Sequence, residues 1–453
     1  MEEHQGFLSL APTLGVLVLA LISKKTFESL LGGVLIGYVL LYQLDFFDPL
    51  TAGLLKVMQD PTIAWIILVC GLFGSLNYLL VQSGAALGFA NFLLRFVHHR
   101  SAALLATWLM GLSIFIDDYL NALAVGTTMK KITDKFRVPR EMLAYIVDST
   151  AAPVCVLIPL STWAIFVSGL LETNGVAQAG GGLQAYVGVI PFMLYAWIAA
   201  IMVPLVALGY IPALGRMKEA EVRAAGGILV PPNSESIALD IPELKSTRIP
   251  RPAHFLFPLI ILIGSTVWFD IDALKGIITC LVFTIIYFAW QKILSLAALL
   301  DGVFEGFKTM IHALAIIIIS FVLKDINDEL GLTAYILETV SPAMSRELLP
   351  VIAFVSLSLV TFATGSFWGV YAIALPIIIP LADSLGVHTG LAIGAVISSG
   401  AFGSHACFYG DATVLSASAT GCNNMAHVLT QLPYALLAAV LSVLGYLVLG
   451  YLI

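Results

Sequence analysis

Eight long apolar runs constrain this chain more than any other feature of its sequence. A helix needs ~20 mainly apolar residues to cross the hydrocarbon core of a bilayer. The runs are continuous and helix-like, unlike the short alternating segments of an outer-membrane barrel. They cover residues 7–23, 27–43, 62–82, 187–209, 253–270, 274–290, 309–328 and 428–450. The sequence therefore predicts an all-α polytopic membrane protein.

The composition supports this class and argues against two others. Apolar residues make up 60% of the 453 positions and charged residues 11%, whereas soluble domains contain about 45–50% and about 25%. A soluble globule of this composition would expose large apolar patches and aggregate. A net charge of −7 argues against a nucleic-acid partner. The five cysteines form no CxxC pair, so we expect neither a disulfide nor a thiolate metal site.

The chain divides into two halves around a hydrophilic stretch that is rich in proline and charge. A shift of about 247 positions places the span 27–43 on the span 274–290 and Gly84 on Gly331. Repeats with helices broken in matching places are typical of secondary transporters. We predict a first repeat over 1–209, a cytoplasmic linker over 210–252 and a second repeat over 253–453.

Each half is expected to hold five full spans, one re-entrant hairpin and one broken helix. The hairpins are placed at about 101–135 and 346–385, and the broken helices at about 142–170 and 389–419. Five is an odd number, so the second repeat would be inverted relative to the first. Of the 21 Lys and Arg residues, 17 then lie on the cytoplasmic side, as the positive-inside rule requires, and four lie outside: Lys56, Lys275, Lys324 and Arg346.

This topology makes both termini external. The first run, 7–23, is preceded by Glu2 and Glu3 and lacks a basic region ahead of it. A secretory signal peptide would begin with such a basic region. We therefore expect this run to be a retained first span.

The first hairpin carries two adjacent carboxylates in an apolar setting, Asp117 and Asp118, followed by Asn121. On insertion scales, one Asp at the centre of a span costs about 2.5–3.5 kcal/mol. Asn121 lies one helical turn beyond Asp117, on the same face. The acids could instead pair with a basic residue and hold the hairpin, but the next Lys or Arg in the segment is Lys130. The pattern favours a cation or proton site.

The broken span that follows offers oxygen ligands beside a proline. Pro153 removes a backbone donor and frees a carbonyl one turn earlier. Asp148, Ser149 and Thr150 supply the oxygen ligands that hard cations prefer. The alternative is a proline kink whose hydroxyls bond their own helix. We predict that Asp117, Asp118 and Asp148 titrate and hold sodium, with Asn121, Ser149 and Thr150 as neutral ligands.

The second hairpin has hydroxyls and glycines but no acid at its tip. A helix N-terminus there could bind an anion, or its carbonyls a cation. The matching broken span contains three glycines in eleven residues, which predicts an interrupted helix. The candidate substrate-binding residues of this half are Thr364, Gly365, Ser366, Ser398, Ser399, His405 and Asp411.

Two other interpretations of the polar residues are weaker. Ser404, His405 and Asp411 could be mistaken for a hydrolase triad, but no GxSxG nucleophile elbow surrounds Ser404. We therefore expect no enzymatic activity. Four further histidines lie near span ends, where an interfacial position is expected: His254, His312, His388 and His427.

At four motifs the chain resembles the NhaC family of sodium/proton antiporters. The motifs are Phe115–Asn121, Thr133–Lys135, Asp148–Cys155 and Gly400–Thr413. The resemblance spans nearly the whole chain. It implies the fold of the ion transporter superfamily, with two inverted repeats, paired hairpins and broken helices, often moving as an elevator in a dimer. Relatives exchange organic acids or carry amino acids with sodium.

These observations predict a sodium/proton antiporter of the cell inner membrane or plasma membrane that works by alternating access. Carboxylates crowded into one poorly solvated pocket cannot all ionise cheaply, so sodium and protons would compete for it. The main alternative is a sodium- or proton-coupled carrier of a small carboxylate or amino acid, favoured by the acid-free second hairpin. A passive channel is weaker, because two interrupted repeats indicate rocking. We expect a homodimer and no cofactor beyond the transported ions.

Overall fold

The computed structural model describes residues 4–23, 25–178, 180–232, 234, 251–339, 344–364, 367–408 and 410–453. Within these ranges every regular element is an α-helix or a short 3-10 helix. The prediction of an all-α protein is therefore confirmed. The sites predicted at Gly365 and Ser366 lie outside the described residues, as do the side chains of Thr364 and Asp411.

The first half contains twelve of the described α-helices. They are α1 (Ala11–Ser23), α2 (Thr26–Tyr42), α3 (Phe47–Met58), α4 (Pro61–Gln82), α5 (Ala85–Leu93), α6 (Arg100–Ser113), α7 (Asp118–Lys135), α8 (Arg140–Thr150), α9 (Ala152–Leu157), α10 (Thr162–Thr173), α11 (Gly182–Val189) and α12 (Leu194–Ala207). Local signals set their ends: α4 begins with Pro61 after Asp60, whose carboxylate accepts a hydrogen bond from the Thr62 N–H.

The second half repeats much of this order after α13 (Arg216–Ala225), a helix within the predicted linker. Its helices are α14 (Pro252–Trp268), α15 (Ala273–Trp290), α16 (Leu296–Thr309), α17 (Ile311–Glu329), α18 (Leu332–Thr339), α19 (Leu349–Thr364), α20 (Phe367–Leu385), α21 (Thr389–Ala406), α22 (Asp411–Thr420) and α23 (Asn424–Leu452). Both halves thus run from a helical pair through a short helix to a long helix, a hairpin and a broken span.

Many of these helices are long and apolar enough to cross a bilayer. The described residues contain eight such spans, or nine if α11 and α12, which meet at a bend of 60°, count as one. Two shorter apolar helices cover Gly6–Leu19 and Pro252–Trp268. The chain is an integral membrane protein with multiple spans.

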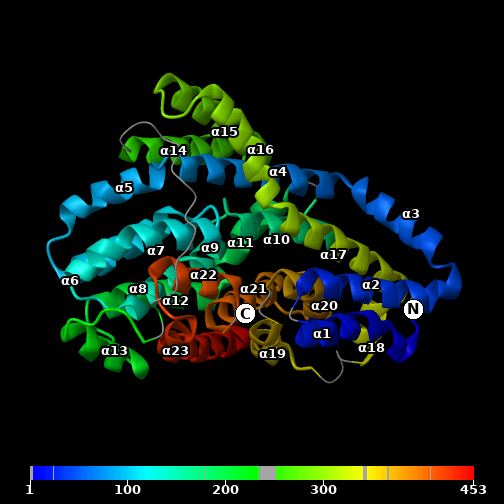
Figure 1. The fold of residues 1–453 in the computed structure, drawn as a ribbon. Helices are drawn as coiled ribbons and strands as arrows, with labels where there is room; N and C mark the ends of the chain where they lie inside the picture. The colour runs from blue at the N-terminus through cyan, green and yellow to red at the C-terminus, as the bar shows by residue number, and fades with distance from the viewer. Residues whose placement is uncertain are drawn as a thin grey trace.

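The two halves are packed against each other along several helices. In Figure 1 most long helices run across the view in similar directions, and α4 lies against α16. At this crossing a Cβ on Gly306 would lie 2.5 Å from the Gly74 carbonyl oxygen. Small residues let helix backbones approach closely in membranes. Further contacts join α2 to α17, α5 to α14, and α7 and α8 to α22.

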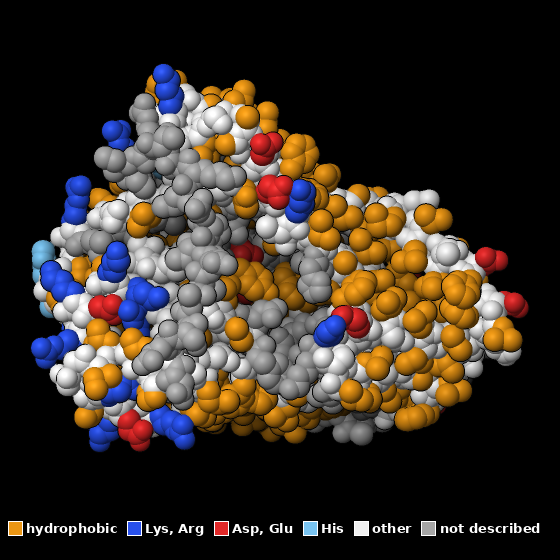
Figure 2. Space-filling view, in the orientation of Figure 1, with side chains coloured by type: hydrophobic (Ala, Val, Ile, Leu, Met, Phe, Trp, Pro, Cys, Tyr) orange, Lys and Arg blue, Asp and Glu red, His pale blue; other side chains and the backbone are white. Residues whose placement is uncertain are grey.

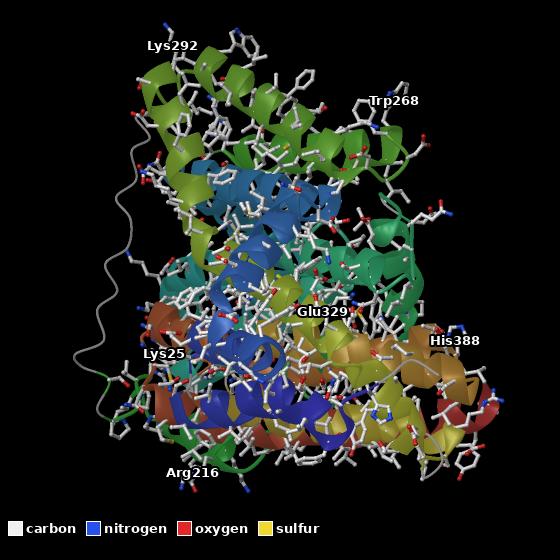
Figure 3. All side chains as sticks on the ribbon, turned by 90° about the vertical axis from the view of Figure 1, so that its right-hand side faces the viewer. Lys25, Arg216, Trp268, Lys292, Glu329 and His388 are labelled. Atoms are coloured by element: carbon white, nitrogen blue, oxygen red, sulfur yellow. The ribbon has the colours of Figure 1, made fainter. Side chains whose placement is uncertain are left out.

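The surface is charged at one end and apolar over much of the rest. In Figure 2, Lys and Arg side chains gather at the end of the molecule formed by α6, α7 and α13, and hydrophobic side chains cover broad areas elsewhere. The pair α14 and α15 projects from the body, with Trp268 and Lys292 marking its two ends (Figure 3). Trp268 and Trp290 are 82% and 76% exposed, as expected for tryptophans at the two edges of a bilayer.

Two glycines of the second predicted broken span lie inside a continuous helix. The three glycines of the second broken span led us to expect an interruption within residues 398–413. In the structure α21 continues through Gly400 and Gly403 to Ala406, and α22 begins at Asp411. A Cβ would lie 2.3 Å from Tyr371 Oη at Gly400 and 2.3 Å from Thr361 Cβ at Gly403. These glycines therefore serve close helix packing, and the helix stops only at Cys407.

Candidate ion-binding site

The first helix break lies between α6 and α7 and is held by one amide. Asn121 Nδ2 lies 2.7 Å from the Gly111 carbonyl oxygen, 2.9 Å from that of Ile114 and 2.8 Å from that of Thr150. The first two carbonyls end α6, where a helix leaves its last acceptors unsatisfied. The third lies at the end of α8. Asn121 therefore joins two helix ends, and it is fully buried.

A second pair of breaks divides the span over residues 140–173. At Ala151, φ is −79° and ψ is −96°, so the helix stops after Thr150. Pro153 lies in the first turn of α9. Backbone N–H groups in a first turn have no acceptor within the helix, so proline costs no helical hydrogen bond there. Ser161 then caps α10 by accepting a hydrogen bond from the Ala164 N–H. Irregular backbone of this kind is tolerated inside a membrane only where protein or a cavity surrounds it.

Asp117 and Asp118 lie at the first break and are 4% and 1% exposed. The contacts of Asp117 include Asn77 Nδ2 and Thr162 Oγ1, each 3.4 Å from one of its carboxylate oxygens. Asp118 occupies the first turn of α7. Thr162 begins α10, and its N–H donates to the Ile116 carbonyl at 2.9 Å. The N-terminal ends of two helices therefore meet near these carboxylates, and such ends favour negative charge.

Asp148 has a different environment and no exposed surface. Its Oδ2 accepts a hydrogen bond from Gln431 Nε2 at 2.7 Å and lies 3.1 Å from His427 Nε2. Its Oδ1 is buried and has no hydrogen-bond partner among the described residues. Gln431 Nε2 also donates to the His405 carbonyl oxygen. Asp148 thus connects α8 of the first half to α23 and α21 of the second.

His405 extends this network through two hydroxyl groups. Ser149 Oγ lies 2.9 Å from its Nε2, and Tyr195 Oη lies 2.7 Å from its Nδ1. The Tyr195 N–H in turn donates to Ser398 Oγ at 3.3 Å, and Tyr446 Oη donates to the same oxygen at 2.7 Å. All five side chains are 1% exposed or less.

The structure brings some predicted site residues together and separates others. Ser149, His405 and Ser398 belong to the network around Asp148. Asp117 has its own neutral contacts, and Asn121 bridges the two regions through Thr150. Ser399 donates to the Val396 carbonyl of its own helix at 2.6 Å, and Thr150 likewise bonds Ile146 and Val147.

Several residues of the network were missed from the sequence. The interfacial position predicted for His427 is wrong, because its side chain has no exposed surface and faces Asp148. His254 is also buried, at 3% exposed. His427 and Gln431 are four residues apart and so share one face of an apolar helix. A polar pair inside a span was the signal that could have revealed them.

Comparisons with known proteins identify the family and the fold of this chain. The family model described as Na+/H+ antiporter family matches residues 165–451. The chain belongs to the Na+/H+ antiporter family. This membership confirms the resemblance to NhaC proteins and makes the chain a sodium-coupled transporter of the membrane, not an enzyme.

Two known proteins align with this Na+/H+ antiporter family member, one over nearly its whole length and one over a short segment. An uncharacterized protein of Haemophilus influenzae is 29% identical over 484 residues, which span 98% of this chain and 91% of that protein. A malate-2H(+)/Na(+)-lactate antiporter of Bacillus subtilis is 31% identical over 94 residues, 21% of this chain and 20% of that protein.

Solved transporters share the fold. The YdaH transporter of Alcanivorax borkumensis is 11% identical and superimposes with a TM-score of 0.62 over 97% of this chain and 98% of its own. MtrF of Neisseria gonorrhoeae is 12% identical, with a TM-score of 0.53 over 90% of this chain and 85% of its own. At such low identity the likeness concerns the fold alone.

Proposed function

We propose that this protein exchanges sodium for protons across the membrane by alternating access. The observation that carries the proposal is the environment of Asp148: a fully buried carboxylate whose ion-pair partner is a histidine. Histidine itself gains and loses a proton near neutral pH. The described structure therefore places no permanently charged lysine or arginine side chain in an ion pair with Asp148.

The exchange follows from the cost of buried charge. An ionised carboxylate away from water is strongly disfavoured unless something positive binds it. A sodium ion and a proton each carry one positive charge, so either can neutralise the buried carboxylate. We expect the pocket to move between the two sides of the membrane when it holds sodium or a proton. The empty pocket carries negative charge that nothing compensates, so we expect it not to cross. Asp117, Asp118 and Asp148 are the proposed titrating and sodium-binding groups.

Reconstituted vesicles test the exchange directly. Purified protein is placed in proteoliposomes that contain a pH-sensitive dye and no organic solute. A sodium gradient should then drive protons in the opposite direction, and vesicles without protein should show no such change. Proton movement that requires an added organic solute would contradict this proposal.

The second candidate is a sodium-coupled carrier or exchanger of a small carboxylate. It is supported by the Bacillus subtilis relative, whose name includes malate and lactate, and by the acid-free hairpin at Thr364 to Ser366. Adding malate, lactate or an amino acid to the same vesicles separates the two candidates. Proton or sodium flux that appears only with one of these solutes would establish the carrier.

We also propose a membrane topology and an oligomeric state for this protein. We propose that residues 1–209 and 253–453 are inverted repeats, with the linker in the cytoplasm and both termini outside the plasma or inner membrane. A homodimer is proposed from the family resemblance. Cysteine labelling from each side of sealed vesicles, and the mass of the protein in detergent, would test these two points.

A further inference from the structure

We propose that Asn77 on α4 is a further sodium ligand, whose side-chain carbonyl oxygen joins the carboxylate of Asp117 around the ion. This inference rests on the proposed binding of sodium at Asp117. The motifs singled out in the sequence lie in the hairpins and the broken spans, whereas α4 runs without a break from Pro61 to Gln82. Sodium would therefore connect the first hairpin to a long helix outside it.

The packing of α4 places Asn77 beside the first helix break. α4 contacts both α7 and α10, and Asn77 Nδ2 lies 3.4 Å from Asp117 Oδ1. A Cβ on Gly169 of α10 would collide with Ile66 of α4. Asn77 follows Ile66 by eleven residues, about three helical turns, so both belong to the face toward α10. Ile66 and Phe73 are fully buried on that face, where a polar side chain is costly and indicates a function.

A close helix crossing fixes the position of Asn77. About one turn before it, a Cβ on Gly74 would lie 2.6 Å from the Gly306 carbonyl oxygen of α16. Ser75 Oγ donates a hydrogen bond to the Val303 carbonyl oxygen of α16 at 2.7 Å. These contacts leave α4 little room to slide along α16. Asn77 is therefore held on a rigid support, as a binding group must be.

The side-chain amide of Asn77 is only partly satisfied. Its Oδ1 is buried and has no hydrogen-bond partner within the described ranges, and a buried acceptor of this kind requires an explanation. Its Nδ2 is 3.4 Å from the Asp117 carboxylate, whereas a strong bond from N–H to a carboxylate measures about 2.7–2.9 Å. Thr162 Oγ1 is also 3.4 Å from the other carboxylate oxygen. Both neutral groups thus stand back from the charge.

This separation suits oxygens that share one ion. Oxygen ligands about 2.4 Å from a hard cation, and at right angles to each other, lie about 3.4 Å apart. A half-turn about the Cβ–Cγ bond of Asn77 exchanges its nitrogen and its oxygen, and this terminal torsion is broad and roughly two-fold. The nitrogen faces Asp117 in the structure, and the oxygen would take its place when sodium binds. The carbonyl oxygen of an Asn side chain is a ligand that hard cations accept.

The test measures sodium binding without transport. Wild-type protein and Asn77→Leu are compared in detergent at one pH by binding of radioactive sodium, and thermal unfolding verifies that each is folded. Gln82→Leu is the matched control. Gln82 lies on the same helix, is 5% exposed and has a buried amide oxygen without a partner in the part of the chain that the structure describes. That oxygen lies beside Gly302 of α16.

A second measurement detects the ligand itself. The side-chain carbonyl groups of asparagine are labelled with carbon-13, and infrared spectra are recorded with sodium and with choline. A carbonyl that coordinates sodium absorbs at a lower frequency, so the difference spectrum of the wild type should contain a labelled band that Asn77→Leu lacks. Gln82→Leu should retain this band.

Asn77→Leu should weaken sodium binding by about ten- to a hundredfold, as expected when a charged partner loses one polar contact. Gln82→Leu should bind sodium as the wild type does. The same loss in both variants would overturn the inference, since any polar residue of α4 would then have the same effect.

Two further results would also overturn it. Unchanged sodium affinity in folded Asn77→Leu would remove the residue from the site. Weakened binding without a band that depends on Asn77 would mean that the amide only positions Asp117 through its N–H group. Absence of sodium binding in the wild type is a different outcome, because it refutes the proposed function as well.

Discussion

His427 Nε2 lies 3.1 Å from Asp148 Oδ2, although 279 positions separate the two residues in the sequence. The contact joins α8 of the first half to α23 of the second, inside a region without exposed surface. Any motion that changed the packing of α8 on α23 would change what neutralises the carboxylate. The contact therefore ties the charge of the site to the relative position of the two halves.

Asp117→Asn should abolish sodium-driven proton exchange. The substitution removes the charge that holds sodium, while its amide can still meet the neutral groups of Asn77 and Thr162. The same exchange of Asp for Asn at Asp325, which pairs with Lys56, should change the rate little. Dye-loaded proteoliposomes measure both variants, and a normal rate in Asp117→Asn together with loss in Asp325→Asn would contradict the site.

Gln431→Met should slow exchange by roughly ten- to a hundredfold, because a hydrogen bond to a carboxylate contributes about 1.5–3 kcal/mol. The variant removes the donor shared by Asp148 and the His405 carbonyl, and methionine fills a similar volume. Initial proton flux and its pH profile are the measurements. Gln291→Met at the end of α15 is the control. A normal flux with an unchanged pH profile would show that the amide does not act on Asp148.

Asn121→Ala should destabilise the protein by on the order of 2 kcal/mol, because three carbonyls lose their donor in a buried position. It should also loosen coupling, so that sodium moves with fewer protons. Thermal unfolding gives the first effect, and the ratio of sodium to proton flux gives the second. A folded variant with an unchanged ratio would indicate that the amide only supports the backbone.

Gly306→Ala should destabilise the protein by about 1–3 kcal/mol through overpacking. The new methyl group would meet the Gly74 carbonyl and the Ser75 Cα, each at 2.5 Å, where α16 crosses α4. Gly264→Ala on α14 is the matched control, since nothing lies within 4 Å of its Cβ. That control should be neutral or more stable by about 0.5–1 kcal/mol. Equal thermal stability of the two variants would refute the close crossing.

Arg223→Ala should destabilise the protein more than Arg100→Ala. Arg223 on α13 bonds both carboxylate oxygens of Glu141, at 2.8 and 2.7 Å, and the Glu141 side chain is 2% exposed. Removing the arginine leaves a buried carboxylate without its partner, at a cost of about 1–3 kcal/mol.

Arg100 pairs with Glu221 closer to water, where an ion pair contributes at most about 1 kcal/mol. Adding Glu141→Gln to Arg223→Ala should restore part of the loss, because the uncompensated charge is then gone. Thermal unfolding in detergent measures the series. A double variant less stable than Arg223→Ala alone would mean that Glu141 has another role.

Local features of the sequence were enough to predict the class and several elements. The spacing of apolar runs required membrane helices, because only a helix satisfies its own backbone in a bilayer. Pro153 marked the break beside Asp148 for the same local reason, since proline has no N–H to donate. Gly400 and Gly403 were misinterpreted because a glycine can serve either backbone freedom or close packing, and the sequence alone does not distinguish them.

The sequence by itself determined that this is an all-helical membrane protein with acidic residues in apolar segments. Only the tertiary structure decided which groups face those acids: Asn77 and Thr162 at Asp117, and His427 and Gln431 at Asp148. Apolar periodicity and helix breaks depend on neighbours along the chain, whereas the partner of a buried carboxylate depends on how distant helices pack. That is why a histidine near the end of a span could belong to the centre of the site.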